Sequence, residues 1–314
     1  MKKQLTKSLD EKDLTQLEPS LVIISSKGAK MSTIKSLISE AQKKFSNVLV
    51  VPINKIQIQT SEQGVGLFYK GKNLLCYDVI YPRVSSKDFF LAEAVLKAIE
   101  SSDSYSPVSL KSFQITNHKF YTSQILSNKG LPGVTSTFFI SSRRAQMAVS
   151  ETGYPFVMKL ISGFAGKGVV LINNNDQMES ILDAVHLFEE FICTQKFIKG
   201  KNFDIRCYVI GNLVLVVKRT SKKGDWRANI SRGGSAQLIN PTPEMISIAQ
   251  NAAKELGMDI CAVDLMQHKN KWVVIEVNFM PGPFMKYLGN TIIHEWLRYL
   301  SVKGKKIKKQ KNSC

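Results

Sequence analysis

Two carboxylates and one amide in the last third of the chain have the types and spacing of a metal site. Glu276 and Asn278 are two residues apart in the segment VVIEVN, so in a strand both side chains point to one face. If a hairpin turns around Asn270, Asp264 lies directly opposite Glu276. Oxygen donors of this kind suit Mg²⁺ bridging phosphates. The apolar setting favours this interpretation over polar residues on the wet face of a sheet.

A glycine-rich segment, Gly163-Phe-Ala-Gly166-Lys-Gly168, lies between two predicted strands. Glycine allows backbone N–H groups to approach phosphate oxygens and form an anion-binding nest. The spacing matches neither the Walker A sequence nor the dinucleotide fingerprint, and tight hairpins also use glycine. Just before it, Lys159 is the only charged residue of the strand FVMKLI. Because a buried lysine needs a partner, Lys159 is either a phosphate contact or a solvent-facing strand residue.

A second charged group flanks the predicted hairpin turn Gly211-Asn212. Counting outward from that turn places Asp204 opposite Arg219, with Arg206 on the strand of Asp204. A cross-strand ion pair is the simple interpretation. The functional alternative places Arg219 on a transferred phosphate or a carboxylate substrate, with Asp204 accepting from a ribose hydroxyl.

The polar segment GDWRANISRGG contains Arg227, Asn229 and Arg232 beside paired glycines. Arginines in such a setting suit carboxylate or phosphate recognition, although surface loops also carry these residues. The cysteines are scattered and form no C-x-x-C pair: Cys76, Cys193, Cys207, Cys261 and Cys314. This pattern is typical of reduced thiols in a cytosolic protein, and no motif around them indicates a catalytic cysteine.

The elements that position these residues alternate between strand and helix patterns. Apolar runs at 21–26 and 48–52 flank a helical pattern that starts at Ile34, which predicts a parallel α/β layer. A hairpin-like segment and a strand follow, then a helix near 117–127, a strand at 155–161 and a helix from Asp176. Two hairpins separated by a helix from Thr242 to Gly257 complete the pattern. We therefore predict a mixed α/β (α+β) chain.

The predicted organisation has five parts. They are a disordered lead-in at 1–19, a first domain at 20–112, a central subdomain at 113–193, a C-terminal subdomain at 194–300 and a basic tail at 301–314.

The net charge of +18 includes six lysines between residues 303 and 311. It implies an acidic partner such as nucleotide phosphates, polyglutamate or RNA, although a solvated run is the simpler interpretation of the tail alone. The chain lacks both the apolar run of a spanning helix and the apolar stretch of a secretory signal. We therefore expect a cytoplasmic protein with no membrane partner.

Taken in order, these segments resemble the ATP-grasp superfamily and, within it, the RimK-like glutamate ligases. The resemblance runs from about residue 21 to residue 300. It rests on YKGKNL with DVIYPRV, NHK at 117–119, FVMKLISGFAGKGVVL, QKFI, FDIRCYVIGN, GDWRANISRGGSA, AVDLM and VIEVNFMPG. It implies a pre-ATP-grasp domain followed by two ATP-grasp subdomains that hold ATP between them.

The resemblance also implies a role for each candidate residue. The phosphates of ATP are contacted by Lys119 and Lys159 and covered by the loop with Gly163, Gly166 and Gly168. The hinge meets adenine through its backbone and consists of Gln195, Lys196, Phe197 and Ile198, while Asp204 holds the ribose. Two Mg²⁺ or Mn²⁺ ions are carried by Asp264, Glu276 and Asn278. The acyl phosphate or its carboxylate is stabilised by Arg219, Arg232 and Asn229. Further substrate contacts are Arg83, Arg206 and Arg227.

The implied reaction is ATP-dependent ligation of a carboxylate to an amine through an acyl phosphate. Glutamate is the expected amine donor, and the acceptor is an acidic protein C-terminus or a small cofactor. The chain departs from the family at Lys196, where an acidic residue is usual, and at NFMPGPFMKYLG after the metal strand, which leaves the acceptor open. Because relatives are commonly dimers or tetramers, a homo-oligomer is also expected.

Three alternatives remain. The first is a LysX-like ligase that adds another amino acid on an amino-group carrier protein. The second is an ATP-grasp kinase that stops at phosphoryl transfer. The third is a basic RNA- or ribosome-associated binding protein.

Overall fold

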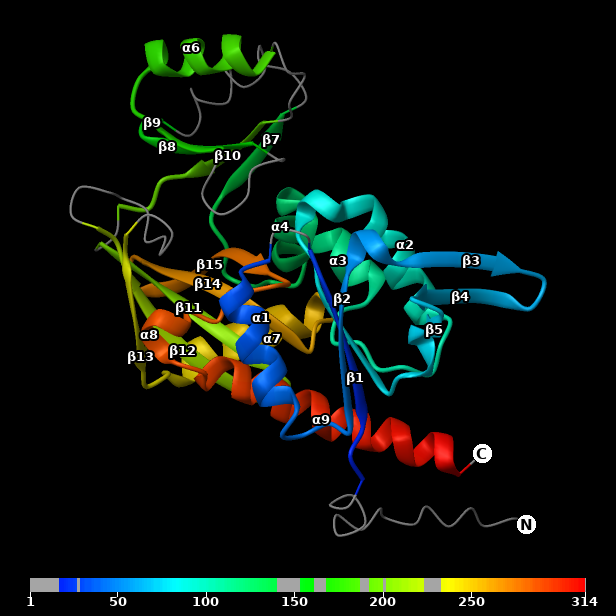
Figure 1. Cartoon of the computed structure of the whole chain (residues 1–314). Coiled ribbons are helices and arrows are strands. Elements are labelled where there is room, and N and C mark those ends of the chain that lie inside the picture. The colour runs from blue at the N-terminus through cyan, green and yellow to red at the C-terminus, as the bar shows by residue number, and fades with distance from the viewer. Residues whose placement is uncertain are drawn as a thin grey trace, which may run out of the picture. The chain divides into compact units, whose positions relative to one another are not determined.

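The computed structural model describes residues 17–26, 29–139, 153–160, 168–186, 192–199, 202–222 and 233–313. The chain divides into two units, one formed by residues 1–110 with 290–314 and the other by residues 111–289 (Figure 1). None of the described helices is both long and apolar enough to cross a membrane.

The first unit contains a parallel three-stranded sheet in the order β2-β1-β6. Its central strand β1 (Ser20–Ser25) pairs in parallel with β2 (Asn47–Pro52) and with β6 (Val79–Arg83). Helix α1 (Met31–Ala41) connects β1 to β2, which confirms the predicted strand–helix–strand order. The side chains of residues 21–24 are fully buried, as expected for the central strand of a parallel sheet.

An antiparallel sheet in the order β3-β4-β5 and helix α2 (Phe89–Glu100) complete the N-terminal part of this unit. The strands are β3 (Gln57–Ser61), β4 (Gly64–Tyr69) and β5 (Lys72–Asn73). The hairpin of β4 and β5 is the one predicted from the sequence. Strand β3 gave no sequence signal, because all its side chains are exposed and no alternation of apolar residues marks it.

The last element, helix α9 (Thr291–Asn312), differs from the basic tail predicted at 301–314. The helix belongs to the first unit, and its buried face continues beyond Leu300 to Gly304. At Gly304 a Cβ atom would lie 2.6 Å from Cγ2 of Val79, so the helix backbone sits directly against β6. The lysine-rich composition concealed this helical spacing.

Two of the tail lysines bond to the backbone of the first unit. Lys308 Nζ donates to the carbonyl of Glu18 at 2.7 Å, and Lys311 Nζ donates to the carbonyl of Tyr77 at 3.1 Å. Part of the positive charge therefore has a structural role.

The second unit is built around an antiparallel five-stranded sheet in the order β13-β12-β11-β14-β15. The strands are β11 (Phe203–Ile210), β12 (Leu213–Thr220), β13 (Ser235–Ile239), β14 (Ile260–His268) and β15 (Lys271–Asn278). One face packs against α7 (Pro243–Glu255), with Ile115 of α3 (Leu110–Asn117) and Leu126 of α4 (Lys119–Asn128) in the same core. As predicted, Thr242 caps α7 by accepting a hydrogen bond from the backbone N–H of Met245.

A β-bulge in the hairpin of β14 and β15 sets the register of the metal candidates. Leu265 pairs with Val274, whereas the preceding residue, Asp264, pairs with Glu276. Ile275 is therefore an extra residue on β15. Without the bulge, Ile275 would stand opposite Asp264 and Glu276 would point into the core.

A smaller antiparallel sheet in the order β7-β10-β8-β9 also belongs to the second unit. Its strands are β7 (Ser136–Phe139), β8 (Phe156–Leu160), β9 (Val169–Ile172) and β10 (Ile192–Lys196). Helix α6 (Asn175–His186) covers one face, where Phe156 and Met158 are buried against it (Figure 1). The sequence predicted a helix from Asp176, whereas α6 begins at Asn175 and is capped by Asn174, whose side chain accepts from the backbone N–H of Gln177.

Candidate active site

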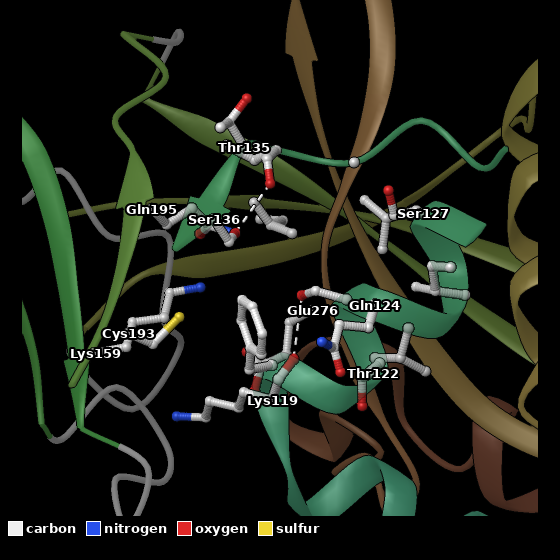
Figure 2. Close-up of a pocket in the computed structure, with 18 of the residues that line it drawn as sticks. Lys119, Thr122, Gln124, Ser127, Thr135, Ser136, Lys159, Cys193, Gln195 and Glu276 are labelled. Carbon is white, nitrogen blue, oxygen red and sulfur yellow. Dashed lines mark hydrogen bonds between the residues drawn. The ribbon is translucent and has the colours of Figure 1, made fainter. Parts of the chain in front are cut away.

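A pocket of about 450 Å³ in the second unit is lined by both of its sheets and by α4. It brings together four residues singled out in the sequence, Lys119, Lys159, Gln195 and Glu276 (Figure 2). The side chains of Lys119 and Lys159 extend toward the same part of the pocket from opposite sides (Figure 2). Two lysine ammonium groups in one pocket suit an anionic ligand such as a polyphosphate.

Lys159 faces the pocket because of its register in the small sheet. It pairs with Cys193, and Val157 pairs with Gln195, so these side chains point away from the face that α6 covers. Burial lowers the pKa of Lys159 from its ordinary value, and the nearby Glu276 carboxylate partly opposes that shift. A phosphate would favour the charged form of this lysine in the same way.

The segment that contains Gln195 is hydrogen-bonded to residues at the start of strand β7. Gln195 Nε2 donates to Ser136 Oγ at 3.2 Å, and the backbone N–H of Lys196 donates to the carbonyl of Thr135 at 3.0 Å. Ile198 is buried, whereas the side chain of Lys196 is exposed. Because its side chain is exposed, a lysine at position 196 in place of the usual acidic residue does not alter the backbone of this segment.

The three metal candidates lie on one face of the large sheet, as the sequence predicts. Asp264 pairs with Glu276 and Ala262 pairs with Asn278 across the hairpin. Asn278 Nδ2 lies 3.4 Å from Asp264 Oδ2. Asp264 is only 2% exposed, whereas Glu276 is exposed and lines the pocket.

Two arginines and two aspartates form a buried ion-pair cluster beside these residues. Arg206 donates from Nε and Nη2 to the two oxygens of Asp264, both at 2.7 Å. Arg219 donates from Nε and Nη2 to the two oxygens of Asp204, both at 2.6 Å, and from Nη2 to Asp264 at 3.0 Å. The predicted cross-strand pair of Asp204 and Arg219 is confirmed. The four charges balance one another.

The pKa values of the two aspartates in the cluster are shifted in opposite directions. Burial raises the pKa of Asp204 to about 6, although Arg219 opposes the shift. Burial alone would also raise the pKa of Asp264, but Arg206 and Arg219 outweigh it and hold that pKa below its ordinary value. Asp264 is therefore the carboxylate that remains ionised while Asp204 takes up a proton first.

Comparison with known proteins identifies the family. The family model described as RimK-like ATP-grasp domain matches residues 116–300, and the one described as RimK PreATP-grasp domain matches residues 20–112. A protein of Hydrogenovibrio crunogenus named "Probable alpha-L-glutamate ligase" is 34% identical over 265 residues, which cover 83% of this chain and 88% of that protein. The chain belongs to the RimK-like ATP-grasp family. It is an ATP-dependent ligase.

Solved structures share the ATP-grasp fold. The ATP-grasp ligase PsnB, complexed with a phosphomimetic variant of its minimal precursor, Mg and ADP, superimposes with a TM-score of 0.71 at 17% identity over 92% of this chain and 99% of that one. The D-alanine–D-alanine ligase from Bacillus anthracis, complexed with ATP, gives 0.69 at 16% identity over 94% and 99%. At these identities the likeness concerns the fold alone.

Some residues implied by the ATP-grasp resemblance are not among those that line the pocket, and others lie outside the described residues. Arg83 belongs to the first unit, where it is buried, donates to Tyr81 Oη at 2.8 Å and lies 4.7 Å from the ring centre of Trp296. Gly168 has a φ of 74° directly before β9. Five candidates lie outside the described residues: Gly163, Gly166, Arg227, Asn229 and Arg232.

Several residues around the pocket and the ion-pair cluster were not predicted from the sequence. Tyr208 lies on the face of β11 that carries Asp204 and Arg206, and alternation along that strand could have indicated it. Burial raises its pKa to about 12, so its phenol remains a hydrogen-bond donor. Ser136 and Cys193 line the pocket because of the pairing of β10 with its neighbours. Nothing local in the sequence marks that pairing.

Proposed function

We propose that this ligase joins the amine of glutamate to a carboxylate acceptor, using ATP to activate that carboxylate. The observation that carries the proposal is the convergence of Lys119, Lys159 and Glu276 on one pocket, with Asp264 and Asn278 on the sheet face that bears Glu276. The curated relative named "Probable alpha-L-glutamate ligase" supports glutamate as the added amino acid.

The nucleotide is proposed to bind in the pocket with its phosphates between Lys119 and Lys159 and its base at the backbone of residues 195–198. The ion pair with Arg219 already engages both oxygens of Asp204. We therefore assign Asp204 mainly to the orientation of Arg219. Among the described residues none accepts from Arg219 Nη1, which is the nitrogen proposed to meet the reacting carboxylate or phosphate.

The donor set fits one or two divalent cations held by Asp264, Glu276 and Asn278. Among the residues that the structure describes, only Arg206 donates to Asp264 Oδ1, and Asn278 uses its amide nitrogen toward Asp264, which leaves its oxygen for a cation. When bound, Mg²⁺ or Mn²⁺ would offset negative charge on the phosphate oxygens of ATP. Magnesium is the expected ion, and manganese is a suitable probe.

The proposed reaction has two steps. An oxygen of the acceptor carboxylate attacks the γ-phosphorus of ATP, the bond from that phosphorus to the bridging oxygen breaks, and ADP leaves. The amine nitrogen of glutamate then attacks the acyl carbon, phosphate leaves with the electron pair of the broken C–O bond, and the amine loses a proton to solvent. The lysines and arginines position the anions and stabilise developing charge, so no nucleophilic side chain is required.

The acceptor is proposed to be an acidic protein C-terminus or a small cofactor that ends in a carboxylate. The net charge of +18 would attract an acidic acceptor and would continue to attract it as glutamates are added.

The test combines the full chain with ATP, Mg²⁺, isotope-labelled glutamate and a pool of acidic peptides or a cell extract. ADP and phosphate should appear in equal amounts only with an acceptor present, and mass spectrometry should show the labelled glutamate in an amide. The variant Glu276→Gln should be inactive. The matched control is Glu179→Gln, because Glu179 lies on α6, on the opposite side of the small sheet from the pocket.

The alternatives give different results in the same experiment. A phosphorylated acceptor without an amide would establish a kinase. Incorporation of another amino acid, with glutamate ignored, would establish a LysX-like ligase. Tight RNA binding without nucleotide turnover in any acceptor pool would contradict the proposal altogether.

A further inference from the structure

We propose that Phe284, whose segment is anchored by Tyr208, is a positioning residue that holds the guanidinium of Arg206 and through it orients the Asp264 carboxylate for a divalent cation. The inference rests on the proposed metal role of Asp264. It concerns the segment after β15, where the chain departs from the family pattern.

Phe284 has an unusual backbone conformation that its contacts explain. Its φ of 48° and ψ of 42° place a bulky residue in the left-handed region, which such residues rarely adopt. The ring centre lies 5.4 Å from Cζ of Arg206 and 6.2 Å from the ring centre of Tyr208, with the two rings at 83°. The conformation therefore places an aromatic ring against the arginine.

Tyr208 anchors the same segment at a second point. Its side chain is fully buried on the face of β11 that carries Arg206, and its hydroxyl donates to the carbonyl of Gly282. The residues between Asn278 and Phe284 thus run from the end of the metal strand β15 back onto β11. The hydrogen bond from Tyr208 to Gly282 and the ring contact between Tyr208 and Phe284 fix this return.

The contacts restrain Arg206 from two directions. Its Nε and Nη2 atoms are bonded in bidentate fashion to the two oxygens of Asp264, and its charged group also lies near the Phe284 ring. A bidentate bond fixes the guanidinium plane, and an aromatic ring restricts its movement out of that plane. The Asp264 oxygens then keep one orientation, in which Arg206 is the only donor to Oδ1 within the described part of the chain.

Loss of the ring would free Arg206 to rotate, and the Asp264 carboxylate would rotate with it. Partners that orient a metal ligand typically change metal affinity by about 10- to 100-fold when they are removed. A segment that served only to pack the loop would leave metal affinity unchanged.

The experiment measures Mn²⁺ binding to the full-length protein with ADP bound, from the electron paramagnetic resonance signal of free Mn²⁺ and without turnover. Phe284→Leu removes the aromatic ring and is expected to weaken binding about 10-fold or more. Phe284→Gly suits the positive φ and removes the ring without backbone strain, so it should show the same loss in a folded protein. Phe284→Tyr keeps the ring and should bind as the wild type does.

The matched control is Tyr287→Phe, which removes a hydrogen bond of 2.8 Å from Tyr287 to the carbonyl of Gly234 in the same segment. It should leave Mn²⁺ affinity unchanged. Wild-type affinity in both Phe284→Leu and Phe284→Gly would overturn the positioning role, and so would equal losses in these variants and in the control.

Asp264→Asn separates this inference from the function on which it rests. If Asp264→Asn loses Mn²⁺ binding while the Phe284 variants keep it, only the positioning role is wrong. If Asp264→Asn binds Mn²⁺ as the wild type does, the metal site itself is wrong and this inference is overturned with it.

Discussion

Replacement of Asp264 by asparagine is expected to lower the free energy of unfolding and to abolish turnover. The carboxylate is 2% exposed and accepts bonds of 2.7, 2.7 and 3.0 Å from Arg206 and Arg219. Asparagine has nearly the same shape but no charge, and its amide nitrogen would face a guanidinium donor. The two arginines would then carry two positive charges against the single carboxylate of Asp204.

The expected loss is about 3–5 kcal/mol, the usual cost of breaking a buried ion pair by removing one partner. Folded proteins of ordinary stability have only about 5–15 kcal/mol in total. With a slope of about 2–3 kcal/mol per molar urea, the midpoint should fall by roughly 1–2 M.

Urea unfolding followed by far-ultraviolet circular dichroism measures this change, and ADP release measures turnover. The comparison variant is Glu276→Gln, which alters an exposed carboxylate on the same face. It should also abolish turnover but change the free energy of unfolding by less than about 0.5 kcal/mol. The two variants thus separate the structural role of Asp264 from the role that it shares with Glu276.

Unchanged stability in Asp264→Asn would refute the argument that the arginines depend on this carboxylate. Full turnover in either variant would refute the assignment of both residues to the metal site.

Three further predictions follow from single contacts. Gly304→Ala should lower the free energy of unfolding by about 1–3 kcal/mol, because its Cβ would lie 2.6 Å from Val79. This loss should outweigh the helix propensity of alanine and is measured by thermal unfolding. The control is Lys306→Ala at an exposed position of the same helix, which should have little effect. Because burial raises the pKa of Asp204 to about 6, the folded protein binds more protons than the unfolded chain, so its free energy of unfolding should increase as the pH falls from 6 toward 4. If the difference in free energy of unfolding between the wild type and Asp204→Asn does not change with pH in this window, the prediction is wrong. Since burial lowers the pKa of Lys159, the KM for ATP should rise with alkaline pH in the wild type and stay flatter in Lys159→Arg, and equal pH profiles would count against the phosphate contact.

The sequence correctly predicted that Asp264, Glu276 and Asn278 share one sheet face, but the counting that led there was incomplete. It placed Asp264 opposite Glu276 by counting equally from Asn270. The turn lies at Lys269 and Asn270, which both have positive φ, and this register alone would pair Asp264 with Ile275. The extra residue at the bulge restores the pairing with Glu276. Bulges depend on the neighbouring strand and core, so counting along one hairpin cannot reveal them.

The sequence also concealed the destination of its last residues. Six lysines from 303 to 311 suggested a solvated tail, but Leu300 and Gly304 continue the buried face of α9 against the first unit. Helical spacing was present, but glycine at the contact is not an apolar signal. Only the distance from Gly304 to Val79 explains why a small residue is required there.

By itself the sequence determined the residue types, the hairpins and the family pattern, because strand alternation and turn residues act over short distances along the chain. Tertiary structure decided which side chains meet between strands that are distant in the sequence. It paired Arg206 with Asp264, placed Cys193 beside Lys159 and brought Phe284 onto Arg206. Pairing between distant strands sets these contacts, and burial then fixes their strength, since a charge removed from water requires a partner within bonding distance.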